Sequence, residues 1–284
     1  MAEITQFLKS LLSVSGLSSY EAPVAKLIED KWSPLVDQLS VSRLGSIHGM
    51  KKATLPVDVP SNQKRPSIMI ATHMDAIGLM VSSRNKGFLR VTQVGGVDPR
   101  ILPGTPVIVH ATAERQVEML YGVVAQPPAR ALPANLLDAP IPLNYLLVDV
   151  GLTEAELLRK VNIGDIVSFA TEPTEMCGDV ISGHTLDNRA SVAALTVALE
   201  DLKNKHHAWD VWAVATVQEE TALAGGYTSA FELRPDLAMA VDVTFAKGPG
   251  ASDWSTFPLG KGPTLAIGKN IHPYFFDRYK EQIG

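Results

Sequence analysis

Three stretches of the chain are predicted to be strands that are buried on both faces. Their apolar residues follow one another without the alternation of a strand that is exposed on one face. The stretches are residues 66–72, 210–216 and 237–241. Runs of this kind, separated by helical segments, are typical of a parallel sheet in an α/β domain.

Apolar residues recur at helical spacing in the segments around these strands, which predicts amphipathic helices. The expected helices cover residues 3–13, a segment starting near Pro23, residues 188–203 and a segment over about 225–232. A Gly- and Pro-rich loop over 247–263 leads to an expected short strand over 264–267, and the chain then enters a further helix.

Each of the three buried strands is followed by residues whose ionisable side chains could bind a ligand or take part in a reaction. His73 and Asp75 follow the first strand, the adjacent Glu219 and Glu220 follow the second, and Asp242 follows the third. In an open α/β sheet the carboxyl ends of parallel strands share one edge, where ligands bind. The sequence therefore predicts that histidine and carboxylate side chains meet at this edge, as in a metal site.

Residues 77–172 follow a different pattern, with many short β-like runs separated by Gly and Pro turns. This spacing is typical of a small barrel or sandwich. One helix interrupts it after Thr153, where Thr153 and Glu156 have the spacing of a capping box. We therefore expect a small β domain over 77–172, inserted into a discontinuous α/β domain of residues 1–76 and 173–284.

Composition and charge narrow the class of protein. The 284 residues are 46% hydrophobic and 19% charged, which suits a globular protein with a sizeable core. The net charge of −5 comes without a basic block, so nucleic-acid binding is not expected. No apolar run reaches the ~20 residues of a membrane span, and Gln6 and Lys9 interrupt any signal-peptide core. Cys177 is the only cysteine, which fits a reducing compartment, so we expect a cytoplasmic protein.

Each candidate residue also has an ordinary structural interpretation. His73 could be a buried histidine with one hydrogen-bond partner, Asp187 could be the N-cap of the helix that follows it, and Asp242 could close a turn. The pair Glu219 and Glu220 is harder to explain in this way. Two adjacent carboxylates after an apolar strand repel each other and resist desolvation. A bound cation would neutralise them, so the set as a whole favours a metal site.

Four short motifs together resemble the tetrahedral metallo-aminopeptidases, the relatives of bacterial glutamyl aminopeptidase and of deblocking aminopeptidase. In chain order the motifs are His73-Met74-Asp75, Leu186-Asp187-Asn188-Arg189, Gln218-Glu219-Glu220 and Val241-Asp242-Val243-Thr244. The resemblance covers almost the whole chain. It implies a phosphorylase/hydrolase-like α/β/α catalytic domain with an inserted β-barrel dimerisation domain, and an enzyme that removes N-terminal residues from peptides.

The resemblance further implies two divalent metal ions, zinc or cobalt, and a role for each site residue. His73 and Asp242 would hold one ion, Asp187 would bridge both ions, and Glu220 would hold the second. Glu219 would be the general base, and Asp75 would orient His73. Members of the family form dimers that build twelve-subunit shells, so we expect self-association at least to a dimer, with peptides as substrates.

One ligand that the resemblance implies has no match in the sequence. The second ion in the family takes a histidine from a C-terminal segment, and this chain ends at Gly284 before that segment. His184 and His272 lie elsewhere and do not match the position. We therefore expect one tightly bound ion, a weakly bound second ion and low peptidase activity.

Three alternatives to an aminopeptidase stay open at this point. A two-metal carboxypeptidase or deacylase could use the same α/β plan. An endoglucanase is a second alternative, because some relatives carry that description, although the four motifs give no glycosidase carboxylate pair. The third is a catalytically impaired assembly subunit, which the absent histidine ligand favours and the intact first half-site disfavours.

Overall fold

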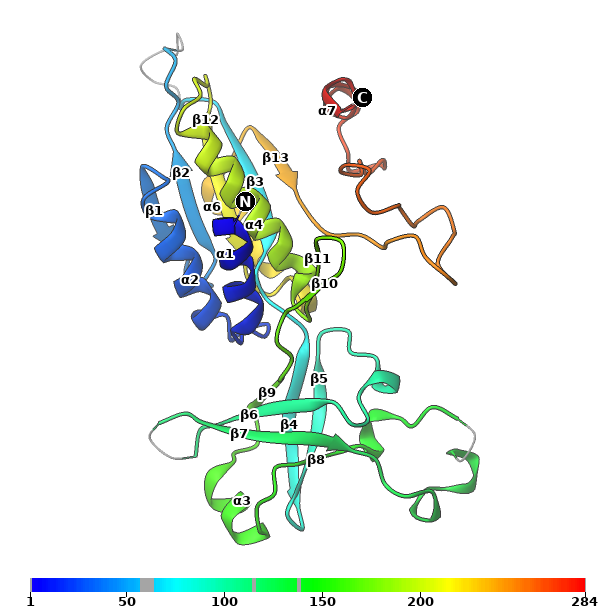
Figure 1. Ribbon diagram of the computed structural model, residues 1–284. Coiled ribbons are helices and arrows are strands. Elements are labelled where there is room, and N and C mark those ends of the chain that lie inside the picture. Colours follow the sequence, from blue (N-terminus) through cyan, green and yellow to red (C-terminus); the bar gives the residue numbers. More distant parts are fainter. Residues whose placement is uncertain (1, 57–63, 114–115, 137–138, 284) are drawn as a thin grey trace. The chain divides into compact units, whose positions relative to one another are not determined.

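The computed structural model describes residues 2–56, 64–113, 116–136 and 139–283 of the chain (Figure 1). Residues 57–63, 114–115 and 137–138 lie outside the described residues. The chain divides into two compact units, of which the first ends at Asp242 and the second begins at Val243. All the candidate site residues belong to the first unit.

Five strands of the described chain form one sheet in the order β1-β2-β12-β3-β13 (Figure 1). Their bounds are β1 Gln38–Val41, β2 Ile47–Lys51, β3 Ser67–His73, β12 Asp210–Thr216 and β13 Leu237–Ala240. β3 runs parallel to β12 and to β13, whereas β2 runs antiparallel to both of its neighbours. The three strands predicted from their apolar runs are these parallel strands, so their carboxyl ends share one edge, as expected.

Helices cover both faces of this sheet (Figure 1). α1 (Ala2–Ser13), α2 (Ala22–Trp32) and α4 (Leu186–Leu202) lie in front of the sheet in this view, and α6 (Ala224–Leu233) lies behind it. The side chains between the front helices and the sheet form one buried core, which includes Leu11, Ile28, Trp32, Ile47, Val192, Leu199, Ala213 and Ala215. On the other face, Ser229 of α6 lies 2.9 Å from the Nε2 atom of His48 on β2.

Six strands of the described residues close into a barrel in the order β4-β5-β8-β7-β6-β9. Their bounds are β4 Gly78–Asn85, β5 Phe88–Val94, β6 Pro106–Ala111, β7 Glu118–Ala125, β8 Leu147–Asp149 and β9 Ile166–Phe169. The barrel core is aliphatic and includes Leu79, Leu89, Val107, Val109, Val124, Val148 and Val167. The predicted fold class, an α/β/α domain with an inserted small β-barrel, is confirmed.

The remaining elements are short or lie in connections. The expected helix of the β region is α3 (Glu154–Lys160), and its capping box forms, since the backbone N–H of Thr153 donates to Glu156 at 3.0 Å. A hairpin of β10 (Thr174–Met176) and β11 (Val180–Ser182) precedes α4, and the one-turn helix α5 (Glu219–Ala222) follows β12. Four 3₁₀ helices complete the described elements of the first unit: η1 (Pro99–Ile101), η2 (Ala129–Ala131), η3 (Ala134–Leu136) and η4 (Leu143–Tyr145).

The strand expected over residues 264–267 is wrong. These residues have no regular secondary structure, and they precede α7 (Pro273–Ile283), the helix of the second unit. A strand needs a partner for its backbone groups, and no described strand pairs with this segment. The side chain of Ile267 is 82% exposed, so the apolar run that suggested a strand buries little surface here.

A buried hydrogen bond between α2 and α4 allows a test of this packing. The indole N–H of Trp32 donates to the Thr196 hydroxyl at 2.8 Å, and both side chains are fully buried. Thr196→Val would leave this donor without a partner, so we expect a loss of about 1–3 kcal/mol in the free energy of unfolding. Urea denaturation measures it, with Thr196→Ser, which keeps the hydroxyl, as the control. Equal stability of the Val variant and the wild type would contradict this role.

Candidate metal centre

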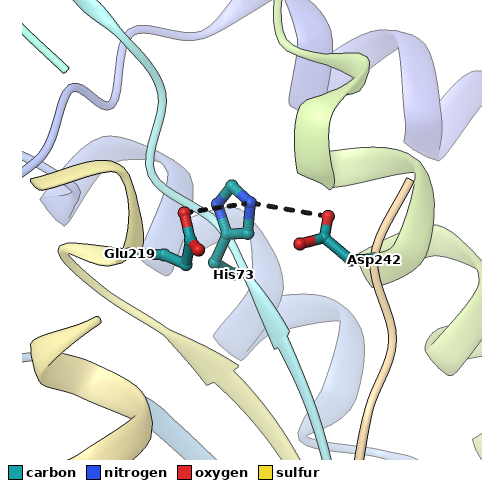
Figure 2. A group of neighbouring side chains, drawn as sticks. All are labelled: His73, Glu219 and Asp242. Carbon is teal, nitrogen blue, oxygen red and sulfur yellow. Dashed lines mark ion pairs between the residues drawn. The ribbon is translucent and has the colours of Figure 1, made fainter. Parts of the chain in front are cut away.

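His73 is the centre of the candidate site. It is the last residue of β3 and its side chain is 3% exposed. Its Nε2 atom lies 3.1 Å from Asp187 Oδ1, 3.7 Å from Glu219 Oε2 and 3.8 Å from Asp242 Oδ1. Figure 2 shows the imidazole between the carboxylates of Glu219 and Asp242, which come from different strand ends. The sequence prediction that these side chains meet at one sheet edge is correct.

The register of the parallel strands brings Glu219 to this place. Thr216, the last residue of β12, pairs with His73. The chain then turns at Gln218, whose φ of 54° lies in the left-handed region, and enters α5 at Glu219. Because the turn follows directly after the paired residue, the two glutamates emerge beside the imidazole.

Asp242 and Asp187 reach His73 from two further segments, the end of β13 and the start of α4. The N–H of Val241 continues the ladder of β13 by donating to Ala71 at 2.8 Å, so Asp242 leaves the sheet close to His73. Asp187 and Asn188 have non-helical dihedral angles, and the regular part of α4 starts after them. The side-chain amide of Asn188 donates to the Val241 carbonyl at 2.9 Å, which ties the two segments together. Asp187 thus faces His73, a position that its N-cap interpretation does not explain.

Asp75 is fully buried and connects three parts of the site. One oxygen lies 3.4 Å from His73 Nδ1, and the carboxylate accepts the backbone N–H of Glu219 at 3.0 Å and of Glu220 at 3.1 Å. It also accepts the hydroxyl proton of Ser18. Burial alone would raise the pKa of Asp75, but the nearby imidazole of His73 and the hydrogen bonds of Ser18 and the Glu219 amide hold it below its usual value. Asp75 therefore contacts His73 and binds the backbone of both glutamates, and the sequence did not indicate the second of these links.

The carboxylates of the site are electrostatically crowded. Burial, followed by the neighbouring Asp187, raises the pKa of Glu220 to about 7, and burial also raises the pKa of Glu219. Burial lowers the pKa of His73, but the nearby carboxylates of Asp187 and Asp75 outweigh it and raise this pKa to about 10. Such shifts mark a cluster whose negative charge lacks a matching positive charge.

The donor set fits a divalent metal ion. Two overlapping groups have ligand atoms that all lie within 4.8 Å of one another: His73 with Glu219 and Asp242, and His73 with Asp187 and Glu220. Imidazole nitrogen and carboxylate oxygen are ligands that zinc and cobalt accept. All five residues expected at the metals and at the general base therefore belong to one or the other of these two groups, which share His73.

Arg189 supports the site in a way that sequence reasoning missed. Its guanidinium is fully buried and donates to the backbone carbonyls of Met74 at 3.1 Å and Val14 at 2.6 Å, and also to that of Leu11. Burial lowers the pKa of Arg189 to about 10, while the nearby Asp75 opposes this shift. The residue belongs to the motif around Asp187, but no local pattern shows that an arginine will be buried among carbonyls from distant segments.

The two histidines considered as further ligands do not join the cluster. His184 packs its ring against Phe169 with the centroids 4.6 Å apart, and its buried Nε2 has no hydrogen-bond partner. His272 belongs to the second unit, next to α7. Among the described residues, neither is a member of a candidate ligand group.

Comparisons with known proteins show which family this chain belongs to. Residues 54–281 match the family of M42 glutamyl aminopeptidases. A lysyl aminopeptidase from Pyrococcus furiosus is 32% identical over 273 residues, which cover 94% of this chain and 74% of that protein. The structure of an aminopeptidase from the archaeon Desulfurococcus kamchatkensis superposes with a TM-score of 0.80 at 34% identity, covering 92% of this chain and 69% of that one. The structure of the TET1 peptidase of Pyrococcus horikoshii, described as assembling into a tetrahedron or a large octahedral shell, matches with a TM-score of 0.76 at 29% identity, over 91% and 73% of the two chains.

These matches define the class of protein. The fold and the family match are those of a metal-dependent aminopeptidase, a hydrolase that acts on peptide bonds. The chain belongs to the M42 glutamyl aminopeptidase family. The alternatives raised by the sequence are not better supported than this assignment. Within the described residues, no helix has the length and apolar character needed to cross a membrane.

The burial of His184 predicts a dependence of stability on pH. Burial and the nearby Arg189 lower the pKa of His184 from its usual value of 6.5 to about 4. Below pH 6.5 the unfolded chain binds a proton that the folded chain does not, so stability falls as the pH drops from 6.5 towards 4. A shift of this size corresponds to on the order of 3 kcal/mol, at ~1.4 kcal/mol for each pKa unit.

Chemical denaturation of the metal-free protein at about pH 7.5 and about pH 5 measures this loss against the His184→Leu variant, which cannot titrate at this position. We expect the variant to lose less stability than the wild type over this interval, because the other titrating groups are the same in both proteins. Equal losses of stability in the two proteins would show that folding does not lower the pKa of His184.

Proposed function

We propose that this enzyme removes N-terminal residues from peptides with Glu219 as the general base. The observation that carries the proposal is the position of Glu219. Its carboxylate lies 3.7 Å from the imidazole of His73, among the same groups that fit a metal, and it is partly exposed, with 31% of the side chain accessible. A carboxylate that is both near the ligands and open to solvent can take a proton from an attacking water.

The other residues of the cluster divide between metal binding and orientation. In this proposal His73 and Asp242 would hold one ion, Asp187 would contribute to both sites, and Glu220 would hold a second ion, with zinc or cobalt as the metal. When bound, such ions polarise the scissile carbonyl and make the attacking water more acidic. Asp75 holds the imidazole of His73 in place through its Nδ1 side and fixes the backbone of both glutamates.

Proton transfer then follows from the position of Glu219. Its carboxylate accepts a proton from the water that attacks the peptide carbonyl and returns it to the amine that leaves. Burial and three neighbouring carboxylates raise its pKa, which makes it a better proton acceptor than an exposed glutamate. The partly exposed side chains of Asp187 and Asp242 carry negative charge towards the substrate, which favours the positively charged amino group of a free peptide terminus.

Glu219→Gln tests the general base. The amide cannot accept the proton, so we expect a decrease in kcat of about 10²–10⁴-fold on aminoacyl chromogenic substrates. Titration calorimetry with zinc or cobalt should give the same number of bound ions as in the wild type, because the proposed ligands are intact. Glu154→Gln on α3 is the matched control at an exposed site. Near-normal turnover of Glu219→Gln at saturating metal would mean that another group is the base.

The same assay distinguishes the proposed aminopeptidase from the closest alternative. A carboxypeptidase or deacylase on the same α/β plan would cleave peptides with a blocked N-terminus, whereas the proposed enzyme requires a free one. We therefore include N-acetylated and free peptides of the same sequence in the substrate panel. A catalytically impaired subunit would give no turnover on either, with or without added metal.

We also propose a cytoplasmic location. Cys177 is exposed and unpaired, which suits a reducing compartment.

We further propose that the protein self-associates as a dimer, a unit from which a dodecamer can be built, and that residues 77–172 are the domain through which subunits meet. The outward side chains of β7 support this proposal. Met119 is 57% exposed, Tyr121 is 68% exposed and Val123 is 39% exposed, and the three alternate along the strand on one face. An apolar stripe of this kind on a closed barrel favours contact with another protein surface, and the assembly of the TET1 relative makes a second copy of this chain the proposed partner.

Tyr121→Lys together with Met119→Lys tests this surface. The two charges would oppose burial of the stripe, so we expect multi-angle light scattering to show a lower mass than for the wild type. Ser82→Lys, at an exposed position of β4, is the control and should keep the wild-type mass. An unchanged mass of the double variant would exclude the β7 stripe as the subunit contact.

A further inference from the structure

The segment between α1 and α2 lies behind the candidate metal centre, although it contains none of the candidate ligands. Leu17 forms a parallel β-bridge with Ala76, just after the first metal motif. Two backbone hydrogen bonds support the bridge, from Ser18 to the Ala76 carbonyl at 3.2 Å and from Ala76 to the Gly16 carbonyl at 3.0 Å. This connection brings Ser18 to Asp75 and leads the chain on to Glu21.

Glu21 is a buried carboxylate with a defined pair of partners. The residue is 6% exposed, and its Oε1 atom accepts the backbone N–H of Ser19 at 2.8 Å and of Gln218 at 3.1 Å. One partner belongs to its own segment, and the other is the residue directly before Glu219. Glu21 therefore joins the α1–α2 connection to the turn that carries the two glutamates.

Three successive amides of that turn are bound to carboxylates from distant segments. The N–H of Gln218 donates to Glu21, and the N–H groups of Glu219 and Glu220 donate to Asp75. Gln218 has a left-handed φ of 54°, and α5 is only four residues long. A turn this short has little stability of its own, so these charge-assisted hydrogen bonds hold its backbone.

We propose that Glu21 is a positioning residue of this enzyme, which acts through the backbone of Gln218 to place the carboxylates of Glu219 and Glu220. Glu21 contacts neither substrate nor metal ligand side chains in this role. The inference rests on the proposed function of Glu219. Displacement of a reacting group by ~1 Å can lower the rate by about 10²-fold, so the bond at Gln218 affects turnover without touching the chemistry.

Substitution of Glu21 tests this role with two matched variants. Glu21→Ala removes the acceptor, and we expect kcat to fall by roughly 10- to 100-fold with a small change in KM. Glu21→Gln keeps a carbonyl oxygen that can accept the Gln218 amide, and it should recover most of the turnover. Asp30→Ala, at an exposed position of α2, is the control and should leave kcat unchanged.

Amide hydrogen exchange in the metal-free protein gives a readout that is independent of activity. Exchange at Gln218, Glu219 and Glu220 should become faster in Glu21→Ala than in Glu21→Gln, while exchange in β3 and β12 stays the same. If Glu21→Ala does not fold, Glu21→Asp replaces it, because the shorter side chain keeps the charge but does not reach both amides. Its expected effects are those of the Ala variant.

The outcomes distinguish the two proposals. Wild-type kcat and wild-type exchange in Glu21→Ala would overturn the positioning role, as would a Gln variant that is as impaired as the Ala variant. A lower melting temperature with unchanged exchange at residues 218–220 would reduce Glu21 to a structural residue and overturn it as well. If instead Glu219→Gln is active while Glu21→Ala accelerates exchange at these amides, the general-base assignment fails and the link from Glu21 to the turn stands.

Discussion

The site depends on one buried negative charge, the carboxylate of Asp75. It is fully buried, and it accepts hydrogen bonds from the Ser18 hydroxyl and from the amides of Glu219 and Glu220 while it contacts His73. An ionised carboxylate is stable at such a place only if its oxygens are well bonded. The groups that stabilise it are therefore held in a fixed arrangement, which is what a catalytic cluster requires.

The same arrangement places more negative charge on one sheet edge than the protein itself balances. Burial and neighbouring carboxylates raise the pKa of Glu220 to about 7, and the nearby carboxylates of Asp187 and Asp75 raise that of His73 to about 10. The folded chain thus gathers groups that repel one another, at a cost in stability that a divalent cation would offset. The aliphatic cores of the sheet and the barrel stabilise the fold, and this stability offsets the repulsion between the crowded carboxylates.

Much of the architecture could be predicted from local pattern. Continuous apolar runs identified β3, β12 and β13, because a strand buried on both faces has no polar alternation, and the polar residues at their ends predicted the cluster around His73. The strand expected over residues 264–267 shows the limit of this reasoning. An apolar run forms a strand only where another strand pairs with it, and pairing is a property of the whole fold.

The order of residues along the chain was enough to predict the candidate site residues. His73, Asp187, Glu219, Glu220 and Asp242 stand at ends of elements that local periodicity defines. How these residues are held in place depends on contacts that form only in the folded chain. The bonds from Glu21 to Gln218, from Asp75 to two amides and from Arg189 to four backbone carbonyls join residues far apart in the chain. No spacing in the sequence encodes them, because each exists only once the sheet, the helices and the α1–α2 connection have packed together.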